Sequence, residues 1–213
     1  MKTYAVFGLG RYGMAVAREL AENGREVMAV DKDERIVNDM ASFLPICKCA
    51  DVTDAEVISR LGIGNIDVVI VCMASNFEAS VMAVTLCKEA GAKTVIAKCA
   101  DEMQQKILLR VGADQVVFPE NESGIRLAKN LVSSGFIDML SLSRDAAIVE
   151  IDVKGEWCGK NLIELNLRKK YGINVVAIKK DETVNVNINP EQALDAESTL
   201  IVIANTSKLA KLQ

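Results

Sequence analysis

Hydrophobic and polar positions alternate between two patterns over the first 120 residues. Short apolar, β-branched runs, typical of strands buried on both faces of a parallel sheet, alternate with segments whose apolar positions have helical spacing. The predicted strands are Tyr4–Phe7, Glu26–Val30, Pro45–Cys49, Val68–Cys72, Thr94–Lys98 and Gln115–Phe118. The predicted helices are Arg11–Asn23, Glu34–Phe43, Asp54–Leu61, Asn76–Ala90 and Glu102–Val111. This order predicts an α/β fold with a doubly wound, Rossmann-like parallel sheet.

The pattern changes after residue 120. An amphipathic helix is predicted over Asn121–Ser134, followed by an apolar connector, Phe136–Leu142. A small α+β lobe is then predicted, with strands Ala147–Val153, Ile173–Lys180, Thr183–Asn189 and Thr199–Ala204, a helix Asn161–Tyr171 and a short C-terminal helix. We therefore expect a Rossmann domain (1–120), a crossover helix and connector (121–142) and a small C-terminal lobe (143–213).

Composition excludes several classes of function. The chain has no histidine, which excludes histidine-based catalysis and zinc sites that need imidazole. Lys and Arg total 25 against 29 Asp and Glu, so the chain lacks the basic footprint of a nucleic-acid-binding protein. No two of its six cysteines have CxxC spacing, and five lie in or beside apolar runs. We predict reduced core cysteines in a cytoplasmic protein, because no signal peptide or membrane-spanning apolar run is visible.

A glycine-rich motif lies between the first predicted strand and helix. It reads Gly8-Leu9-Gly10-Arg11-Tyr12-Gly13, a GxGxxG pattern. Such glycines allow a tight turn, a close approach of a pyrophosphate, and close packing of helix on sheet. Asp31 follows 18 residues after Gly13, where a carboxylate accepts hydrogen bonds from ribose hydroxyls and repels a 2′-phosphate. NAD, ADP or ATP is therefore favoured over NADP, and the alternative is a tight turn with Asp31 as a helix cap.

Met14 and Ala15 stand where a P-loop needs Lys and Ser or Thr, so a P-loop NTPase is excluded. Arg11 is either a clamp for a terminal phosphate or a solvated surface residue.

More candidate ligand-binding residues lie where the other predicted strands end, at the edge where doubly wound sheets bind ligands. They are Lys32, Asp51, Val52, Met73, Ala74, Ser75, Asn76, Lys98 and Glu120. Asp51 either faces an adenine or caps the next helix, and Asn76 is either a ligand contact or a cap. Lys98 and Glu120 either place charge near phosphates or a divalent cation, or are surface charges beside helices.

The sequence does not favour catalysis. A dehydrogenase needs an acid–base group beside its nicotinamide, and the chain has neither a histidine nor a Tyr-x-x-x-Lys pair. We therefore predict a nucleotide-binding switch rather than an enzyme. The alternatives are an NAD(H)-responsive regulator or NAD-dependent oxidoreductase, and a scaffold that binds nucleotide only for stability.

Several segments in order resemble the RCK family, the TrkA-N plus TrkA-C regulators of potassium transport, and within it the KtrA-type cytosolic gating subunits. In the first half they are AVFGLGRYG, VMAVD, ADVTD, IVCMASN, VIAKC and RVGADQVVFPE, and in the second LNLRKKYGINVVAIKKD. The match covers nearly the whole chain.

The resemblance implies a nucleotide-sensing subunit that gates a potassium channel or transporter at the inner face of the cell membrane. It implies homodimers, formed through the helix and connector after Glu120, that assemble into an octameric ring. ATP or ADP, or NAD(H) in some members, would bind at the glycine motif, with Arg11 on the γ-phosphate and Glu120 near Mg²⁺ or Ca²⁺. In some members cyclic di-AMP binds between two small lobes; the matching positions are Ile163, Arg168, Asn174, Val175 and Pro190.

Overall fold

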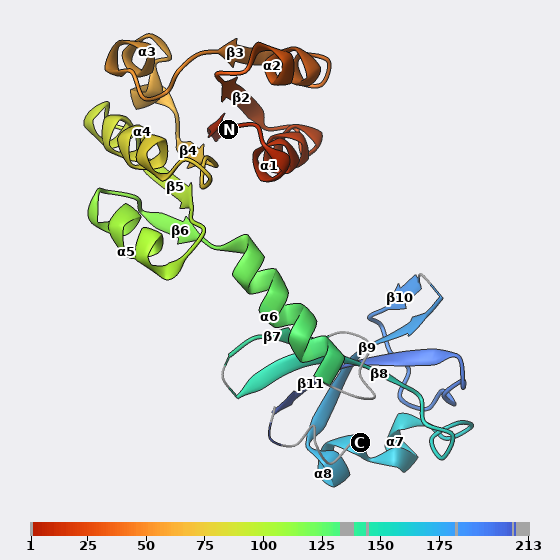
Figure 1. The fold of residues 1–213 in the computed structure, drawn as a ribbon. Helices are drawn as coiled ribbons and strands as arrows, with labels where there is room; N and C mark the ends of the chain where they lie inside the picture. The colour runs from red at the N-terminus through yellow and green to blue at the C-terminus, as the bar shows by residue number, and fades with distance from the viewer. Residues whose placement is uncertain (1, 133–138, 144, 182, 206, 208–213) are drawn as a thin grey trace. The chain divides into compact units, whose positions relative to one another are not determined.

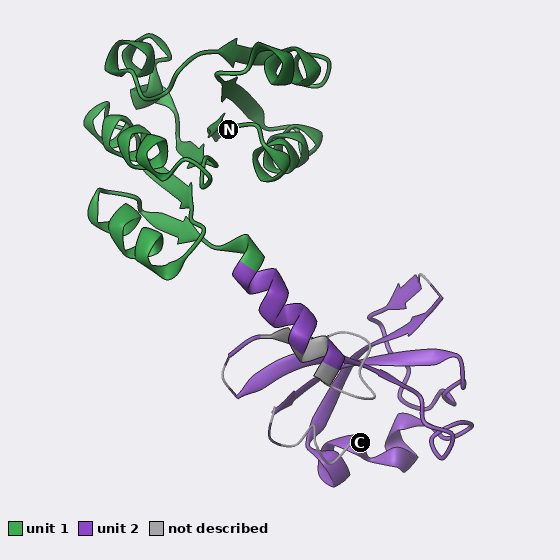
Figure 2. Cartoon of the chain, viewed as in Figure 1, with its two compact units in different colours: residues 1–120 green, residues 121–213 purple. Residues whose placement is uncertain are grey.

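The chain forms two compact units, residues 1–120 and 121–213 (Figures 1 and 2). The computed structural model describes residues 2–132, 139–143, 145–181, 183–205 and 207. The α/β class and the small α+β lobe predicted from sequence are confirmed. Among the described helices, none combines the length and the apolar character that crossing a bilayer requires.

The first unit is built on a six-stranded parallel sheet with strand order β3-β2-β1-β4-β5-β6. Its strands are β1 (Thr3–Phe7), β2 (Glu26–Asp31), β3 (Ile46–Cys49), β4 (Val68–Val71), β5 (Thr94–Lys98) and β6 (Gln115–Val117). Its helices are α1 (Arg11–Glu22), α2 (Glu34–Ala41), α3 (Ala55–Arg60), the 3₁₀ turn η1 (Ile63–Asn65), α4 (Phe77–Glu89) and α5 (Glu102–Arg110). The order reverses between β1 and β4, so a ligand-binding crevice is expected beyond their carboxyl ends.

Alternate residues of the central strands enter two separate cores, one on each face of the sheet. Val6 packs with residues of α1 and α2 such as Ala17 and Met40. Ala5 and Phe7 pack on the opposite face, with residues from α3, α4 and α5. Because both faces are covered, the strands are apolar at nearly every position.

The second unit begins with α6 (Pro119–Val132), whose first two residues belong to the first unit, and contains a five-stranded antiparallel sheet. In sheet order the strands are β10 (Thr183–Asn185), β9 (Ile173–Lys180), β11 (Ser198–Asn205), β8 (Ala146–Asp152) and β7 (Met139–Ser141). Two short helices, α7 (Leu162–Leu165) and α8 (Leu167–Tyr171), pack their leucines with Trp157 into one core on this sheet.

The predicted helix Asn161–Tyr171 is wrong as a single element. Asn166 has φ 44° and ψ 48°, a left-handed conformation that asparagine tolerates, and it divides the segment into α7 and α8. Leu165 and Leu167 are both buried. In a continuous helix, side chains two positions apart point about 200° away from each other, so Leu165 and Leu167 could not both face one core. The break at Asn166 allows both to reach it.

Other boundaries in the second unit also differ. The strand predicted to Asn189 ends at Asn185, whose side chain accepts a hydrogen bond from the Asn187 N–H and turns the chain. Part of the predicted connector forms β7, because it pairs with β8. Residues 133–138 and the predicted C-terminal helix lie outside the described residues, apart from residue 207.

All six cysteines are free thiols, but not all are core residues. Cys87 and Cys99 are buried as predicted. The prediction is wrong for Cys49 and Cys158, which are exposed. Cys49 lies on the edge strand β3, which solvent reaches, and Cys158 lies in a turn before α7.

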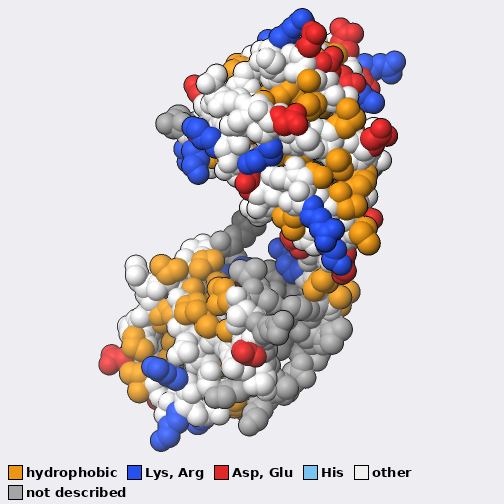
Figure 3. Space-filling view, turned by 90° about the vertical axis from the view of Figure 1, so that its left-hand side faces the viewer, with side chains coloured by type: hydrophobic (Ala, Val, Ile, Leu, Met, Phe, Trp, Pro, Cys, Tyr) orange, Lys and Arg blue, Asp and Glu red, His pale blue; other side chains and the backbone are white. Residues whose placement is uncertain are grey.

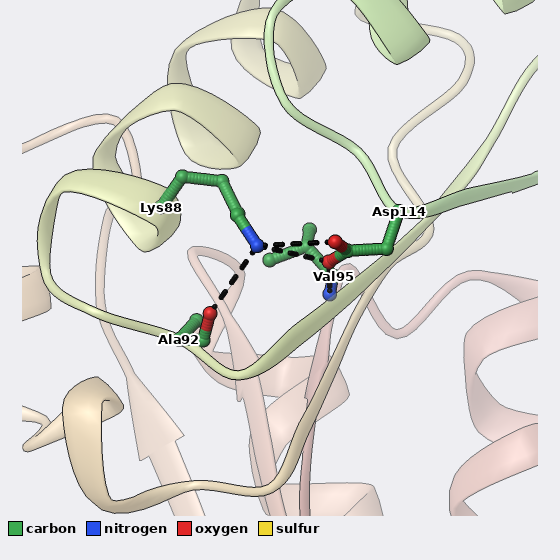
Figure 4. Close-up of polar contacts among 4 residues, drawn as sticks. All are labelled: Lys88, Ala92, Val95 and Asp114. Atoms are coloured by element: carbon green, nitrogen blue, oxygen red, sulfur yellow. Dashed lines mark hydrogen bonds and ion pairs between the residues drawn. The ribbon is translucent and has the colours of Figure 1, made fainter.

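A polar network fastens α4 to β5 and to the residue before β6, the last two strands at one side of the sheet (Figure 4). The Asp114 carboxylate accepts hydrogen bonds from the Val95 N–H at 2.6 Å and from Lys88 Nζ at 3.0 and 3.2 Å. Lys88 also donates to the Ala92 carbonyl. Burial opposes ionisation of Asp114, but the hydrogen bonds from Val95 and Lys88 outweigh it, so its pKa lies below the usual 3.8.

Replacing Asp114 with Ala is expected to lower the free energy of unfolding at pH 7 by about 1–3 kcal/mol, because two donors lose their acceptor. The lowered pKa means that ionised Asp114 stabilises the fold above its unfolded-state pKa, and that this stabilisation is lost as pH falls through the folded-state pKa. The difference between wild type and Asp114→Ala should therefore shrink below about pH 4, measured by urea denaturation. Asp39→Ala, at an exposed position on α2, is the control and should change the free energy of unfolding little. A difference between wild type and Asp114→Ala that does not change with pH would contradict the ionic contribution of Asp114.

Candidate functional site

The glycine motif forms a tight turn that brings the start of α1 against the end of β1. Gly8 has φ +84°, where a side chain is strained, and a Cβ there would lie 2.6 Å from Met73 Cγ. A Cβ on Gly13 would lie 1.9 Å from the Gly8 carbonyl oxygen. Gly10 has open space around it, which leaves its backbone accessible to a ligand. The three glycines therefore perform three different tasks.

The N-terminus of α1 lacks the cap that the neighbouring helices carry. Side chains of Asp33, Asp54, Asn76 and Asp101 accept backbone N–H bonds at the starts of α2, α3, α4 and α5. At α1 the cap residue is Gly10, with no side-chain hydrogen bond and no acidic residue in the first turn. The first residue, Arg11, is an exposed cation at the positive end of the helix dipole. This arrangement suits an external anion.

Asp31 fastens the glycine loop from the neighbouring strand. Its carboxylate accepts hydrogen bonds from the Leu9 N–H at 2.6 Å and the Asp33 N–H at 2.9 Å. Each carboxylate oxygen has two lone pairs, so acceptor capacity remains for ribose hydroxyls. Asp31 thus shapes the loop and also lines the cavity beside it.

A cavity of about 500 Å³ opens beyond the ends of β1, β2, β3 and β4. The predicted residues that line it are Gly8, Gly10, Asp31, Lys32, Asp51, Val52, Met73, Ser75 and Asn76. The predicted residues not among its lining are Leu9, Arg11, Tyr12, Gly13, Ala74, Lys98 and Glu120.

Sequence reasoning missed other lining residues, chiefly Ile36 on α2 and Glu78, Ala79 and Met82 on α4. Glu78 and Met82 are four residues apart and so share a helix face. The sequence signal that could have identified them is this four-residue spacing in the first turns of the helix that follows Asn76.

The cavity has an acidic lining. Its described lining residues include three carboxylates, those of Asp31, Asp51 and Glu78, and one cation, Lys32. Hydrogen bonds from the Thr53 hydroxyl and N–H keep the pKa of Asp51 below its usual value; burial opposes this effect, and the charge of Lys32 adds a smaller lowering. The cap of α3 is Asp54 rather than Asp51. An acidic pocket favours hydroxyl donors and disfavours a 2′-phosphate.

One basic side chain, Lys98 at the end of β5, lies beside the glycine motif. Lys98 Nζ lies 2.5 Å from Glu120 Oε1 and 5.4 Å from the centre of the Tyr12 ring. Burial raises the pKa of Cys72 to about 12, and the nearby charge of Lys98 opposes that rise. Lys98 and Glu120 are therefore paired with each other rather than being separate surface charges.

Asn76 both caps α4 and lines the cavity.

No group of three or more metal-ligating side chains occurs within the described part of the chain. Glu120 contributes one carboxylate, which Lys98 already binds. The described residues of one chain do not fit a divalent-cation site, so the cation at Glu120 stays a prediction.

A second cavity, of about 400 Å³, lies in the second unit around the break between α7 and α8. Four of the five positions that the family resemblance indicated for cyclic di-AMP line it: Ile163, Arg168, Asn174 and Val175. Pro190 is not in the lining; its carbonyl accepts a hydrogen bond from the Leu162 N–H.

The first unit, with its glycine turn and Asp31 at the sheet's switch point, has the Rossmann-like fold of nucleotide-binding domains. Comparison with known proteins specifies the class further: the chain belongs to the family that joins a TrkA-N domain, residues 4–119, to a TrkA-C domain, residues 146–213. The family predicted from the sequence motifs is confirmed.

Two relatives match along nearly their whole length. The chain is 38% identical over 212 residues to Ktr system potassium uptake protein C of Bacillus subtilis, covering 100% of this chain and 96% of the relative. It is 31% identical over 212 residues to protein A of the same system and organism, with the same coverage. A solved GsuK channel bound to NAD has a similar fold, with TM-score 0.66 and 17% identity over 99% of this chain and 38% of the channel chain.

Replacing Gly13 with Ala is expected to destabilise the first unit by about 1–3 kcal/mol, because its methyl group would overlap the Gly8 carbonyl oxygen. Gly10→Ala is the matched control. The φ of Gly10, −64°, suits alanine, and the surroundings of Gly10 are open. Alanine is only a poorer N-cap residue than glycine, so the loss in free energy of unfolding should be under about 1 kcal/mol. Denaturant unfolding measures both variants, and equal losses would contradict the assigned role of Gly13.

Proposed function

We propose that this protein is the regulatory subunit of a potassium uptake system, that it binds adenine nucleotides at the glycine loop, and that it responds differently to ATP and ADP. The observation that carries the proposal is the full-length match, across both domains, to Ktr system potassium uptake proteins. The subunit would act in the cytoplasm, against a membrane-embedded potassium channel or transporter partner. It would regulate by binding one conformation more tightly than another, rather than by catalysis.

The charges of the site support an adenine nucleotide. The acidic cavity with Asp31 and Asp51 suits ribose hydroxyls, while the uncapped start of α1 suits phosphates. Arg11, at the first position of α1, is the candidate for contact with a terminal phosphate. Such a contact would distinguish a triphosphate from a diphosphate.

NAD(H) is the alternative ligand, because a channel with the same fold has been solved with NAD. NAD(H) has no terminal phosphate, so Arg11 would then have no special role. An NAD-dependent oxidoreductase is less well supported, because the sequence supplies no histidine and no Tyr-x-x-x-Lys pair for proton transfer.

The second cavity supports a separate ligand in the C-terminal unit. Arg168 supplies a cation at a pocket otherwise lined by apolar side chains and asparagines. We propose cyclic di-AMP for this cavity, since an arginine fits a phosphodiester and the apolar walls fit a purine.

The test is calorimetric titration of nucleotide-stripped protein with ATP, ADP, NAD, NADH and cyclic di-AMP. Wild type is expected to bind ATP more tightly than ADP, and both more tightly than NAD(H). Arg11→Ala should reduce the preference for ATP over ADP and leave cyclic di-AMP binding unchanged. Arg168→Ala should weaken cyclic di-AMP binding and leave the preference for ATP over ADP unchanged.

Each arginine variant thus serves as the control for the other. Tight NAD(H) binding that ATP and ADP do not displace would overturn the adenine-nucleotide proposal in favour of an NAD(H) sensor. An unchanged ATP preference in Arg11→Ala would remove that arginine from the phosphate site.

We also propose that the subunit forms homodimers, assembling into an octameric ring, through α6 and the connector after it. On α6, Leu127 and Leu131 are 60% and 76% exposed and lie one turn apart on the same face. Exposed apolar side chains are visible on both units in Figure 3. Large apolar residues on one exposed helix face are typical of an interface.

The double variant Leu127→Asp and Leu131→Asp is expected to lower the molar mass in light scattering after size exclusion, because two carboxylates cannot be buried in an apolar interface. Phe43→Asp, at a residue 58% exposed in the first unit, is the control and should keep the wild-type mass. An unchanged mass for the α6 variant would exclude this helix as the interface.

A further inference from the structure

The ion pair between Lys98 and Glu120 connects the nucleotide-binding edge of the sheet to the start of α6. Lys98 is the last residue of β5, and Glu120 is the second residue of α6. Glu120 also ends the first unit, and α6 continues into the second. The pair therefore holds the first turn of the helix through which the chain passes between its units.

The two partners differ in exposure. The Lys98 side chain is only 14% exposed, whereas that of Glu120 is 63% exposed. A largely buried ammonium group needs an anion close by, while an exposed carboxylate can be solvated by water. The electrostatic need for the pair therefore lies mainly with Lys98.

Lys98 also lies beside the proposed phosphate site. Its ammonium group faces the Tyr12 ring of the glycine loop, and its charge acts on Cys72 at the end of β4. The glycine loop and the end of β4 are the two sides of the switch point at which a phosphate group would enter. An anion at the start of α1 would thus be a second potential partner for the same ammonium group.

We propose that Lys98 exchanges partners, from Glu120 in the nucleotide-free protein to the terminal phosphate of a bound nucleoside triphosphate. This inference rests on the proposed nucleotide site and adds how occupancy of that site is passed on. A triphosphate extends further and carries more charge than a diphosphate, so it competes better with Glu120. The first turn of α6 is then held less firmly with ATP than with ADP.

The test is a double-mutant cycle on ATP affinity, measured by calorimetry in EDTA so that no divalent cation replaces Lys98 on Glu120. Lys98→Met should weaken ATP binding at least tenfold. Glu120→Gln should strengthen it several-fold, because Lys98 no longer has to leave a carboxylate. In the Lys98→Met background the Glu120→Gln substitution should have no effect.

The cycle separates the exchange from simpler roles of Glu120. If the carboxylate only repelled phosphate, the gain from Glu120→Gln would persist without Lys98; if it supported the nucleotide, Glu120→Gln would weaken binding. Either result overturns the exchange. Lys98→Gln is a second neutral variant should Lys98→Met not fold. Lys88→Met and Asp114→Asn, in the ion pair of Figure 4, are matched controls that should leave ATP affinity unchanged.

Hydrogen exchange at the amides of residues 123–126, which bond to the first turn of α6, gives an independent readout. ATP should speed exchange there in wild type, ADP should do so less, and Lys98→Met should exchange fast with or without ATP. If ATP leaves the hydrogen-exchange rates unchanged in a protein that prefers ATP to ADP, the partner exchange of Lys98 is overturned while the proposed function stands. A wild type without ATP binding overturns the proposed function and this inference together.

Discussion

The close approach of α1 to the end of β1 is the constraint on which the ligand-binding edge depends. The Gly8 carbonyl oxygen occupies the space that any side chain at position 13 would need. Asp31 holds the same loop from β2 through the Leu9 N–H. With the loop fixed from both sides, the N-terminus of α1 lies at the switch point of the sheet, and the cavity opens beside Gly8 and Gly10.

Charge is distributed unevenly around that edge. Carboxylates line the cavity at the ends of β2 and β3, while Arg11 and Lys98 lie around the glycine loop. A ligand with hydroxyl groups at one end and anionic groups at the other fits this polarity in one orientation only. For such a ligand, the charges of the site would favour that orientation.

Much of this architecture was predictable because its determinants are local in sequence. The period of the apolar positions indicates the strands and helices. The spacing from Gly13 to Asp31 indicates that Asp31 ends the strand next to the glycine loop. Contacts between distant residues carried no such signal. The pairing of Lys98 with Glu120 depends on the sheet placing β5 beside β6, and the break at Asn166 depends on a core that takes both Leu165 and Leu167. Glu78 and Met82 reach the cavity only through the packing of α4.

The distribution of thiols gives each unit one readily accessible nucleophile. Burial raises the pKa of Cys72 and Cys87 to about 12, so these two thiols stay protonated and unreactive at neutral pH. Cys49 in the first unit and Cys158 in the second are exposed. The native sequence therefore offers one preferred attachment position on each unit for a dye or spin label, and distances between the units can be followed spectroscopically without engineered cysteines.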